Sequence, residues 1–190
     1  MAVGFLMSIK KNNIDIENKN IAILGAGGAA RTIAMQFAKT EKVNQIIILN
    51  RNIERANDIC NLVKDNLKVE ILCDKISRLE EYTKDANVVI NTTPLGMYGM
   101  DENFEDFAFL EKMKNGTVID LIYNPKETKL LQEAKKLELK TLNGLDMLIF
   151  QALLADEIYL GKHLNLHELY EIVKRIDLYG TGSHVELLNL

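Results

Sequence analysis

Three small residues follow an apolar run in the stretch IAILGAGGAAR, and their spacing suits the binding of a phosphate chain. Gly25, Gly27 and Ala30 fit the pattern G-x-G-x-x-G/A where a strand would turn into a helix. Gly25 permits the tight turn, Gly27 lets the backbone approach a pyrophosphate, and Ala30 lets helix and strand pack closely. Amides at the start of the helix would then face the phosphates. The pattern predicts a dinucleotide site, against the alternative of a purely structural turn.

Two guanidinium groups stand at the end of the next apolar run, in IIILNRNIERA. A dinucleotide site for NAD usually has an Asp or Glu here, which accepts a hydrogen bond from the adenosine 2′-hydroxyl. This chain has neutral Asn50 and then Arg51, with Arg55 one helical turn later. Guanidinium groups form charge-assisted hydrogen bonds to phosphate. A cation at the start of a helix interacts unfavourably with the helix dipole, so its presence there favours a bound anion. The two arginines therefore predict an NADP clamp; the alternative is two solvated surface charges.

Further polar residues follow the later apolar runs. In NVVINTTPLGM the run stops at Asn91, so Thr92 and Thr93 would lie at the carboxyl edge of a parallel sheet, where open α/β folds bind ligands. Their hydroxyls suit ribose or phosphate, although turn chemistry before a proline also explains them. Tyr123 follows the next run and either points into the cleft or packs on the sheet edge.

The sequence predicts neither a metal site nor an acid-base group in this cleft. His163 and His167 are four residues apart, but Gly161 interrupts the helix that they would share and no third ligand accompanies them. We expect both to be surface histidines. Lys126 and Glu127 flank a turn and should face solvent.

Composition excludes several classes of protein. The chain has 190 residues, of which 47% are hydrophobic and 26% charged, and this predicts one domain, or one domain with an appendage. A formal net charge of −4 argues against a nucleic-acid partner, which would favour a basic surface. No apolar run is long enough to cross a membrane, and no signal peptide is recognisable. Cys60 and Cys73 lie in separate segments, so we expect reduced thiols in a cytoplasmic protein.

Short apolar runs alternate with amphipathic segments, and this alternation predicts an α/β protein with a parallel sheet covered on both faces. We expect a Rossmann-type doubly wound sheet of about six strands in the order 3-2-1-4-5-6, followed by a C-terminal helical extension. Three parts are predicted, namely a nucleotide-binding domain over 1–143, a helical tail over 144–178, and residues 179–190 as a tail compatible with an added tag. The predicted strands are Ile21–Leu24, Gln45–Asn50, Lys68–Leu72, Val88–Asn91, Thr117–Asp120 and Lys140–Leu142. The predicted helices are Gly28–Lys39, Ile53–Lys64, Ile76–Tyr82, Phe107–Met113, Thr128–Leu137, Gly144–Leu160 and Asn165–Leu178.

Five segments together resemble the shikimate dehydrogenase family. GAGGAAR, NRNIERA, NTTPLGM, DLIYNPKET and NGLDMLIFQA occur in the order found in that family, and the resemblance runs from Ala2 to about Leu160. Its members interconvert 3-dehydroshikimate and shikimate with NADP in aromatic amino acid biosynthesis. One departure is Asn52, where the family usually has Thr, and this weakens one expected phosphate contact.

The resemblance implies site residues by motif. The cofactor would contact Gly25, Ala26, Gly27, Gly28 and Ala29 at the pyrophosphate, Asn50, Arg51, Asn52 and Arg55 at the adenosine phosphate, and Thr92, Leu121 and Gly144 near the nicotinamide. The substrate, shikimate or 3-dehydroshikimate, would contact Tyr123 and Gln151.

The resemblance implies no catalytic residue in this chain. Family members carry an N-terminal substrate domain with a catalytic Lys and a catalytic Asp, and the Asp precedes a Gly-Phe pair that matches Gly4 and Phe5. The equivalent of that Asp falls on Met1. We therefore expect the chain to bind NADP but to be inactive alone.

Other functions stay open. Glutamyl-tRNA reductases share the glycine loop and a similar second strand, but DLIYNPKET and NGLDMLIFQA fit them poorly. A stand-alone nucleotide-binding or regulatory module would use the helical tail to bind a partner. Quinate is an alternative substrate to shikimate. Without a substrate domain, the tail should expose an apolar patch that a homodimer would cover.

Overall fold

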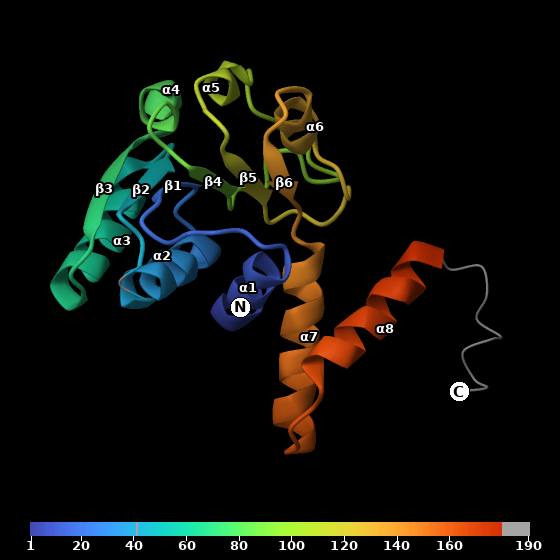
Figure 1. The fold of residues 1–190 in the computed structure, drawn as a ribbon. Coiled ribbons are helices and arrows are strands. Elements are labelled where there is room, and N and C mark those ends of the chain that lie inside the picture. The colour runs from blue at the N-terminus through green and yellow to red at the C-terminus, as the bar shows by residue number, and fades with distance from the viewer. Residues whose placement is uncertain (41, 180–190) are drawn as a thin grey trace.

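The computed structural model describes residues 1–40 and 42–179 and shows a sheet between two layers of helices, with two further helices beyond it (Figure 1). The six strands are β1 (Asn20–Leu24), β2 (Gln45–Asn50), β3 (Glu70–Lys75), β4 (Val88–Asn91), β5 (Thr117–Asp120) and β6 (Lys140–Leu142). The helices are α1 (Ala2–Lys11), α2 (Gly28–Thr40), α3 (Ile53–Asn66), the 3-10 helix η1 (Ile76–Arg78), α4 (Leu79–Thr83), α5 (Ala108–Glu111), α6 (Lys129–Lys136), α7 (Leu145–Leu160) and α8 (Leu166–Tyr179). The predicted tail 179–190 lies, apart from its first residue, outside the described part.

The sheet is parallel throughout and has the order β3-β2-β1-β4-β5-β6, which confirms the predicted doubly wound fold. Successive strand residues point to opposite faces, so the aliphatic runs fill two cores. Ile46 and Ile48 of β2 face α1, α2 and α3, whereas Ile47 and Leu49 face the side covered by α4, α5 and α6. Strands β1, β2 and β4 lie in the middle of the sheet, and their carboxyl ends share one edge.

Three parts of the structure differ from the sequence prediction. The predicted helix Ile76–Tyr82 is divided into η1 and α4. Strand β3 was predicted over Lys68–Leu72 but spans Glu70–Lys75, because its pairing with β2 continues to Asn50 opposite Lys75. Helix α1 was not predicted; it packs on α2 through Phe5 and Phe37, whose ring centroids are 5.9 Å apart, and it also contacts α7.

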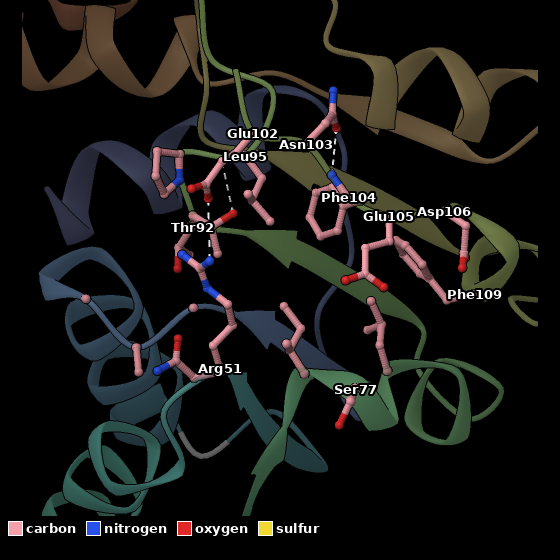
Figure 2. A pocket seen from close by; sticks show the side chains of 18 of the residues that line it. Arg51, Ser77, Thr92, Leu95, Glu102, Asn103, Phe104, Glu105, Asp106 and Phe109 are labelled. Carbon is pink, nitrogen blue, oxygen red and sulfur yellow. Dashed lines mark hydrogen bonds and ion pairs between the residues drawn. The ribbon is translucent and has the colours of Figure 1, made fainter. Parts of the chain in front are cut away.

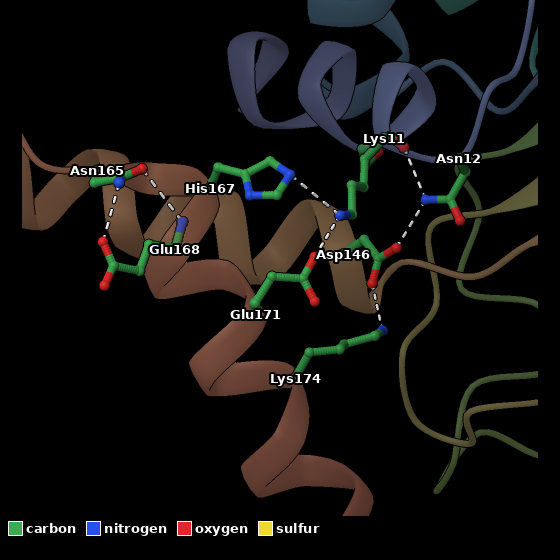
Figure 3. Close-up of polar contacts among 9 residues, drawn as sticks. Lys11, Asn12, Asp146, Asn165, His167, Glu168, Glu171 and Lys174 are labelled. Carbon is green, nitrogen blue, oxygen red and sulfur yellow. Dashed lines mark hydrogen bonds and ion pairs between the residues drawn. The ribbon is translucent and has the colours of Figure 1, made fainter. Parts of the chain in front are cut away.

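Helices α7 and α8 form an arm beyond the edge of the sheet, and α1 packs against α7. Helix α7 extends from the edge of the sheet. The chain then turns back, and α8 starts beside α7 and runs at an angle to it (Figure 1). The stacked rings of Phe150 and Tyr170 join the two helices, with centroids 4.6 Å apart. Buried Asp146 accepts hydrogen bonds from Lys174 of α8 and from Asn12, which follows α1, so one carboxylate links three segments (Figure 3).

Candidate functional site

The glycine turn lies between β2 and β4 at the carboxyl edge of the sheet. Gly25 has φ +103°, a conformation that residues with a side chain rarely adopt, and its amide donates to the Leu49 carbonyl at 2.8 Å. A Cβ at Gly25 would lie 2.7 Å from the hydroxyl oxygen of Thr92. That hydroxyl donates to the Leu24 carbonyl at 2.7 Å, so Thr92 is held against the turn. Only glycine fits at this position.

The next two glycines have a different environment. Nothing lies within 4 Å of the position that a Cβ would take on Gly27 or on Gly28. Helix α2 begins at Gly28, and the amide of Arg31 donates to the Gly27 carbonyl at 3.0 Å. The turn therefore presents bare backbone to open space at a helix start, which is the geometry that a pyrophosphate requires.

A cavity of about 690 Å³ opens beside this turn (Figure 2). Its walls come from the ends of β1, β2 and β4, from η1 and α4, and from the loop that joins β4 to α5. Seven predicted cofactor residues line it, namely Gly25, Ala26, Gly27, Asn50, Arg51, Arg55 and Thr92. Segments far apart in the sequence thus meet at one edge of the sheet.

The arginine end of the cavity is organised by two asparagines. The Asn52 side chain caps α3, since its oxygen accepts from the amides of Glu54 at 2.9 Å and Arg55 at 3.3 Å. The Asn50 amide group donates to the Asn52 carbonyl at 2.8 Å. These contacts fix the turn between β2 and α3, so that Arg51 and Arg55 line the same cavity. Asn52 is thereby engaged as a helix cap, and it does not line the cavity itself.

Sequence reasoning did not identify the carboxylates in this cavity. Glu80, Glu102, Glu105 and Asp106 line it together with the two arginines. The Glu102 carboxylate lies 3.4 Å from the Arg51 guanidinium (Figure 2). Because Glu102 lies in an irregular loop, nothing in its local sequence indicates that it reaches β2.

A fully buried aspartate fixes the neighbouring edge of the sheet. Asp120 ends β5 and accepts hydrogen bonds from the Asn91 side chain at 3.0 Å, the Thr128 hydroxyl at 2.6 Å and the Ile122 amide at 3.1 Å. Burial raises the pKa of Asp120 to about 6, although those hydrogen bonds favour its charged form. The network anchors the segment that carries Leu121 and Tyr123.

The other predicted residues do not line the cavity; they are Gly28, Ala29, Asn52, Leu121, Tyr123, Gly144 and Gln151. Gly144 packs against the backbone of Leu121 so closely that a Cβ would collide with the Leu121 carbonyl oxygen. Tyr123 is 50% exposed. On α7, the Gln151 side chain lies against Gly4 of α1, 2.9 Å from where a Cβ would be. Leu121, Tyr123, Gly144 and Gln151 thus lie along the segment from the end of β5 to α7, whereas Thr92, the other residue expected near the nicotinamide, lines the cavity after β4.

The described ranges hold neither a cluster of metal-binding side chains nor a membrane-spanning helix. Residues 1–40 and 42–179 contain no group of three or more His, Cys, Asp or Glu side chains that could hold a metal ion. Within the same ranges, no helix is long and apolar enough to span a membrane. Cys60 and Cys73 are free thiols.

A parallel doubly wound sheet with a glycine turn and a cavity at its carboxyl edge defines a Rossmann-type domain. The family model described as shikimate / quinate 5-dehydrogenase matches residues 8–147, and the chain belongs to this family.

Relatives and solved structures agree with that assignment. The chain is 44% identical to the NADP-dependent shikimate dehydrogenase of Alkaliphilus oremlandii, over 82% of this chain and 55% of that protein. A shikimate dehydrogenase crystallised with NADP⁺ is 36% identical, with a TM-score of 0.72 over 92% of this chain and 61% of its own. The Listeria monocytogenes shikimate 5-dehydrogenase, solved with shikimate and NAD, is 26% identical, with a TM-score of 0.78 over 90% and 61%. The chain thus spans somewhat more than half the length of these proteins.

Proposed function

We propose that this chain is the cofactor-binding part of an NADP-dependent shikimate dehydrogenase, which interconverts 3-dehydroshikimate and shikimate. The observation that carries the proposal is the position of Arg51 and Arg55 in the same cavity as the Gly25 turn. A phosphate on the adenosine ribose requires cations at the end of the second strand, whereas an NAD site usually has a carboxylate there. The names of the relatives support the same cofactor and substrate.

The residues present fit NADP. Open space beside Gly27 admits a pyrophosphate to the turn, and the start of α2 favours its negative charge. Arg51 and Arg55 would hold the 2′-phosphate by charge-assisted hydrogen bonds. The bound cofactor supplies the hydride acceptor or donor for the alcohol and ketone. The segment held by Asp120 would position Leu121 and Tyr123 toward nicotinamide and substrate.

We further propose that these 190 residues alone turn over shikimate negligibly. Interconversion of an alcohol and a ketone also requires a positioned group that moves the hydroxyl proton. The residues that line the described cavity include four carboxylates but neither Lys nor His. The proposed source of the proton-transfer groups is a substrate domain outside this sequence, consistent with the share of the relatives that the chain covers.

A second candidate is a stand-alone nucleotide-binding module with a protein partner, and one observation favours it. Ile158 and Tyr159, near the end of α7, are 83% and 89% exposed. A helix with apolar residues on all sides is normally covered. In the first proposal the substrate domain or a second copy of the chain would cover this surface; in the module it would bind a different protein. Quinate stays the alternative substrate.

The test is a titration of the purified chain with NADPH and, separately, with NADH, followed by nicotinamide fluorescence. We expect NADPH to bind at least tenfold more tightly, which corresponds to about 1.4 kcal/mol. Arg51→Ala should remove most of that difference, whereas Arg175→Ala, which changes an exposed arginine of α8, should leave it intact. Equal binding of both nucleotides by the unmodified chain would contradict the NADP assignment. Shikimate-dependent formation of NADPH by the chain alone would contradict its inactivity.

A further inference from the structure

The loop between β4 and α5 carries a carboxylate that the proposed cofactor site does not require. The loop is closed on itself by a hydrogen bond from the Gly96 amide to the Glu102 carbonyl at 3.0 Å. It is also tied to the neighbouring segment, because the Tyr98 amide donates to the Asn124 carbonyl at 3.1 Å. Just after Glu102, Phe104 packs on Phe109 of α5, with ring centroids 5.8 Å apart. Glu102 is therefore held at a fixed place on the cavity wall.

From that place the Glu102 side chain reaches the arginine end of the cavity. Its carboxylate lies 3.4 Å from Arg51, and the two side chains are 60% and 75% exposed (Figure 2). Within the described part of the chain, the Arg55 guanidinium has no ion-pair partner, and Glu105 on the same wall makes neither a hydrogen bond nor an ion pair with either arginine. Of the two guanidinium groups proposed to bind the 2′-phosphate, one is thus already paired with an anion.

We propose that Glu102 is a specificity-determining residue that competes with the 2′-phosphate of NADPH for Arg51. This inference rests on the proposed function. An exposed ion pair is weak, so a phosphate can displace it, but displacement must separate Arg51 from Glu102 and leave two anions close together. NADH has no 2′-phosphate and does not require that displacement. Glu102 therefore lowers the preference of the site for NADPH without preventing binding.

Two variants separate this contact from the general effect of charge in the cavity. Glu102→Gln removes the charge that pairs with Arg51, and Glu105→Gln removes an equal charge from the same cavity wall. Glu102→Asp keeps the charge but is one methylene shorter, so it lengthens the contact. Both positions, 102 and 105, are exposed, and these three substitutions are expected to leave folding unchanged.

The experiment measures the dissociation constants of NADPH, NADH and adenosine 2′,5′-bisphosphate for the full chain and the three variants. Glu102→Gln should bind NADPH and the bisphosphate about two- to fivefold more tightly, which is the change in affinity that the free energy of one exposed ion pair gives. The affinity for NADH should not change. Glu102→Asp should show part of this gain, and Glu105→Gln should change NADPH binding by less than about twofold.

The inference is overturned if Glu102→Gln leaves NADPH binding unchanged, or if Glu105→Gln tightens it equally. In both cases the proposed function stands, because the chain still binds NADPH. If neither the chain nor any variant binds either nucleotide, the proposed function itself fails, and the inference fails with it.

Discussion

The sheet and the arm of α7 and α8 bury their apolar residues to different extents. In β2 the four residues Ile46–Leu49 are all buried, each on the face that its position in the strand dictates. In α7 Ile149, Phe150 and Leu153 are buried, but Ile158, Tyr159 and Leu160 are exposed. The aliphatic run of β2 is thus fully covered within the described structure, whereas the arm buries only part of its apolar surface there.

The two regions also stabilise a buried aspartate differently. Asp120, in the sheet, accepts hydrogen bonds from neutral groups only, and burial raises its pKa to about 6. Burial also acts on Asp146 in the arm, but hydrogen bonds from Lys174 and Asn12 and the charge of Lys174 outweigh it and hold the pKa of Asp146 below its ordinary value. The buried aspartate of the sheet is thus held by neutral hydrogen-bond donors, whereas that of the arm is held mainly by an ion pair.

The largest effect is expected where the two regions join. Gly144→Ala places a Cβ against the Leu121 carbonyl, and because both groups are backbone, the chain must shift to accept it. We expect a loss of more than about 3 kcal/mol in the free energy of unfolding, measured by urea denaturation. The matched control is Gly27→Ala, whose Cβ enters open space; it should cost less than about 1 kcal/mol but weaken NADPH binding. Equal destabilisation by both substitutions would contradict this account of Gly144.

The next effect concerns the sheet alone and depends on pH. Because the pKa of Asp120 rises on folding from its ordinary value of 3.8 to about 6, the unfolded chain loses this proton at lower pH than the folded chain does. Stability should therefore fall as pH rises from about 4 to about 6, by up to about 3 kcal/mol from this group.

Asp120→Asn removes that titration. The difference in unfolding free energy between the variant and the unmodified chain should change across this pH range and be constant above about pH 7. Urea denaturation at a series of pH values measures it, with Asp106→Asn, an exposed residue, as the control. A difference that does not vary with pH would show that Asp120 is already ionised at pH 4 in the folded state.

The smallest of these effects belongs to the arm. Lys174→Met leaves the buried Asp146 carboxylate without its cation. We expect a loss of about 2 kcal/mol in the free energy of unfolding, which is less than for a fully buried ion pair because Lys174 is partly exposed. Hydrogen exchange should locate the loss in α8 and leave the sheet protected. Lys174→Met combined with Asp146→Asn is the control and should recover most of the stability. Faster exchange of β1 and β4 in the single variant would mean that sheet and arm are one cooperative unit.

The sequence predicts strands well where the residues on both faces of the sheet are apolar. The predicted bounds of β2, β4, β5 and β6 agree with the structure, and in β2, β4 and β5 a short apolar run ends in a polar residue, Asn50, Asn91 or Asp120. The predicted bounds of β3 were wrong because this strand lies at the edge of the sheet. Its last residues, Cys73, Asp74 and Lys75, pair with β2 through their backbone and give no apolar signal in the sequence. The predicted helix Ile76–Tyr82 is divided into η1 and α4. Helix α1 was missed because Met1 is not a residue type that signals a helix start, and Gly4 lies within the helix.

The sequence predicts those site residues that directly follow a strand, but not those that reach the site from a loop. The glycine turn and the two arginines follow directly after strands, so strand order alone brings them together. Glu102 reaches Arg51 from a loop whose path depends on contacts with Asn124 and Phe109, and no spacing in the sequence encodes such a path. The capping role of Asn52 was also missed, although an Asn before an amphipathic segment is a recognised signal.

The contact between Gly25 and Thr92 has an evolutionary consequence. The two residues share one small space between β1 and β4, and the Thr92 hydroxyl fills it by bonding to Leu24. A larger residue at position 25 would require a smaller one at position 92, yet the backbone conformation of Gly25 penalises any side chain even then. A substitution of Gly25 is therefore unfavourable whichever residue stands at position 92. We therefore expect substitutions to accumulate at positions such as Glu102. A change there would alter the proposed preference for NADPH and leave the conformation of the glycine turn intact.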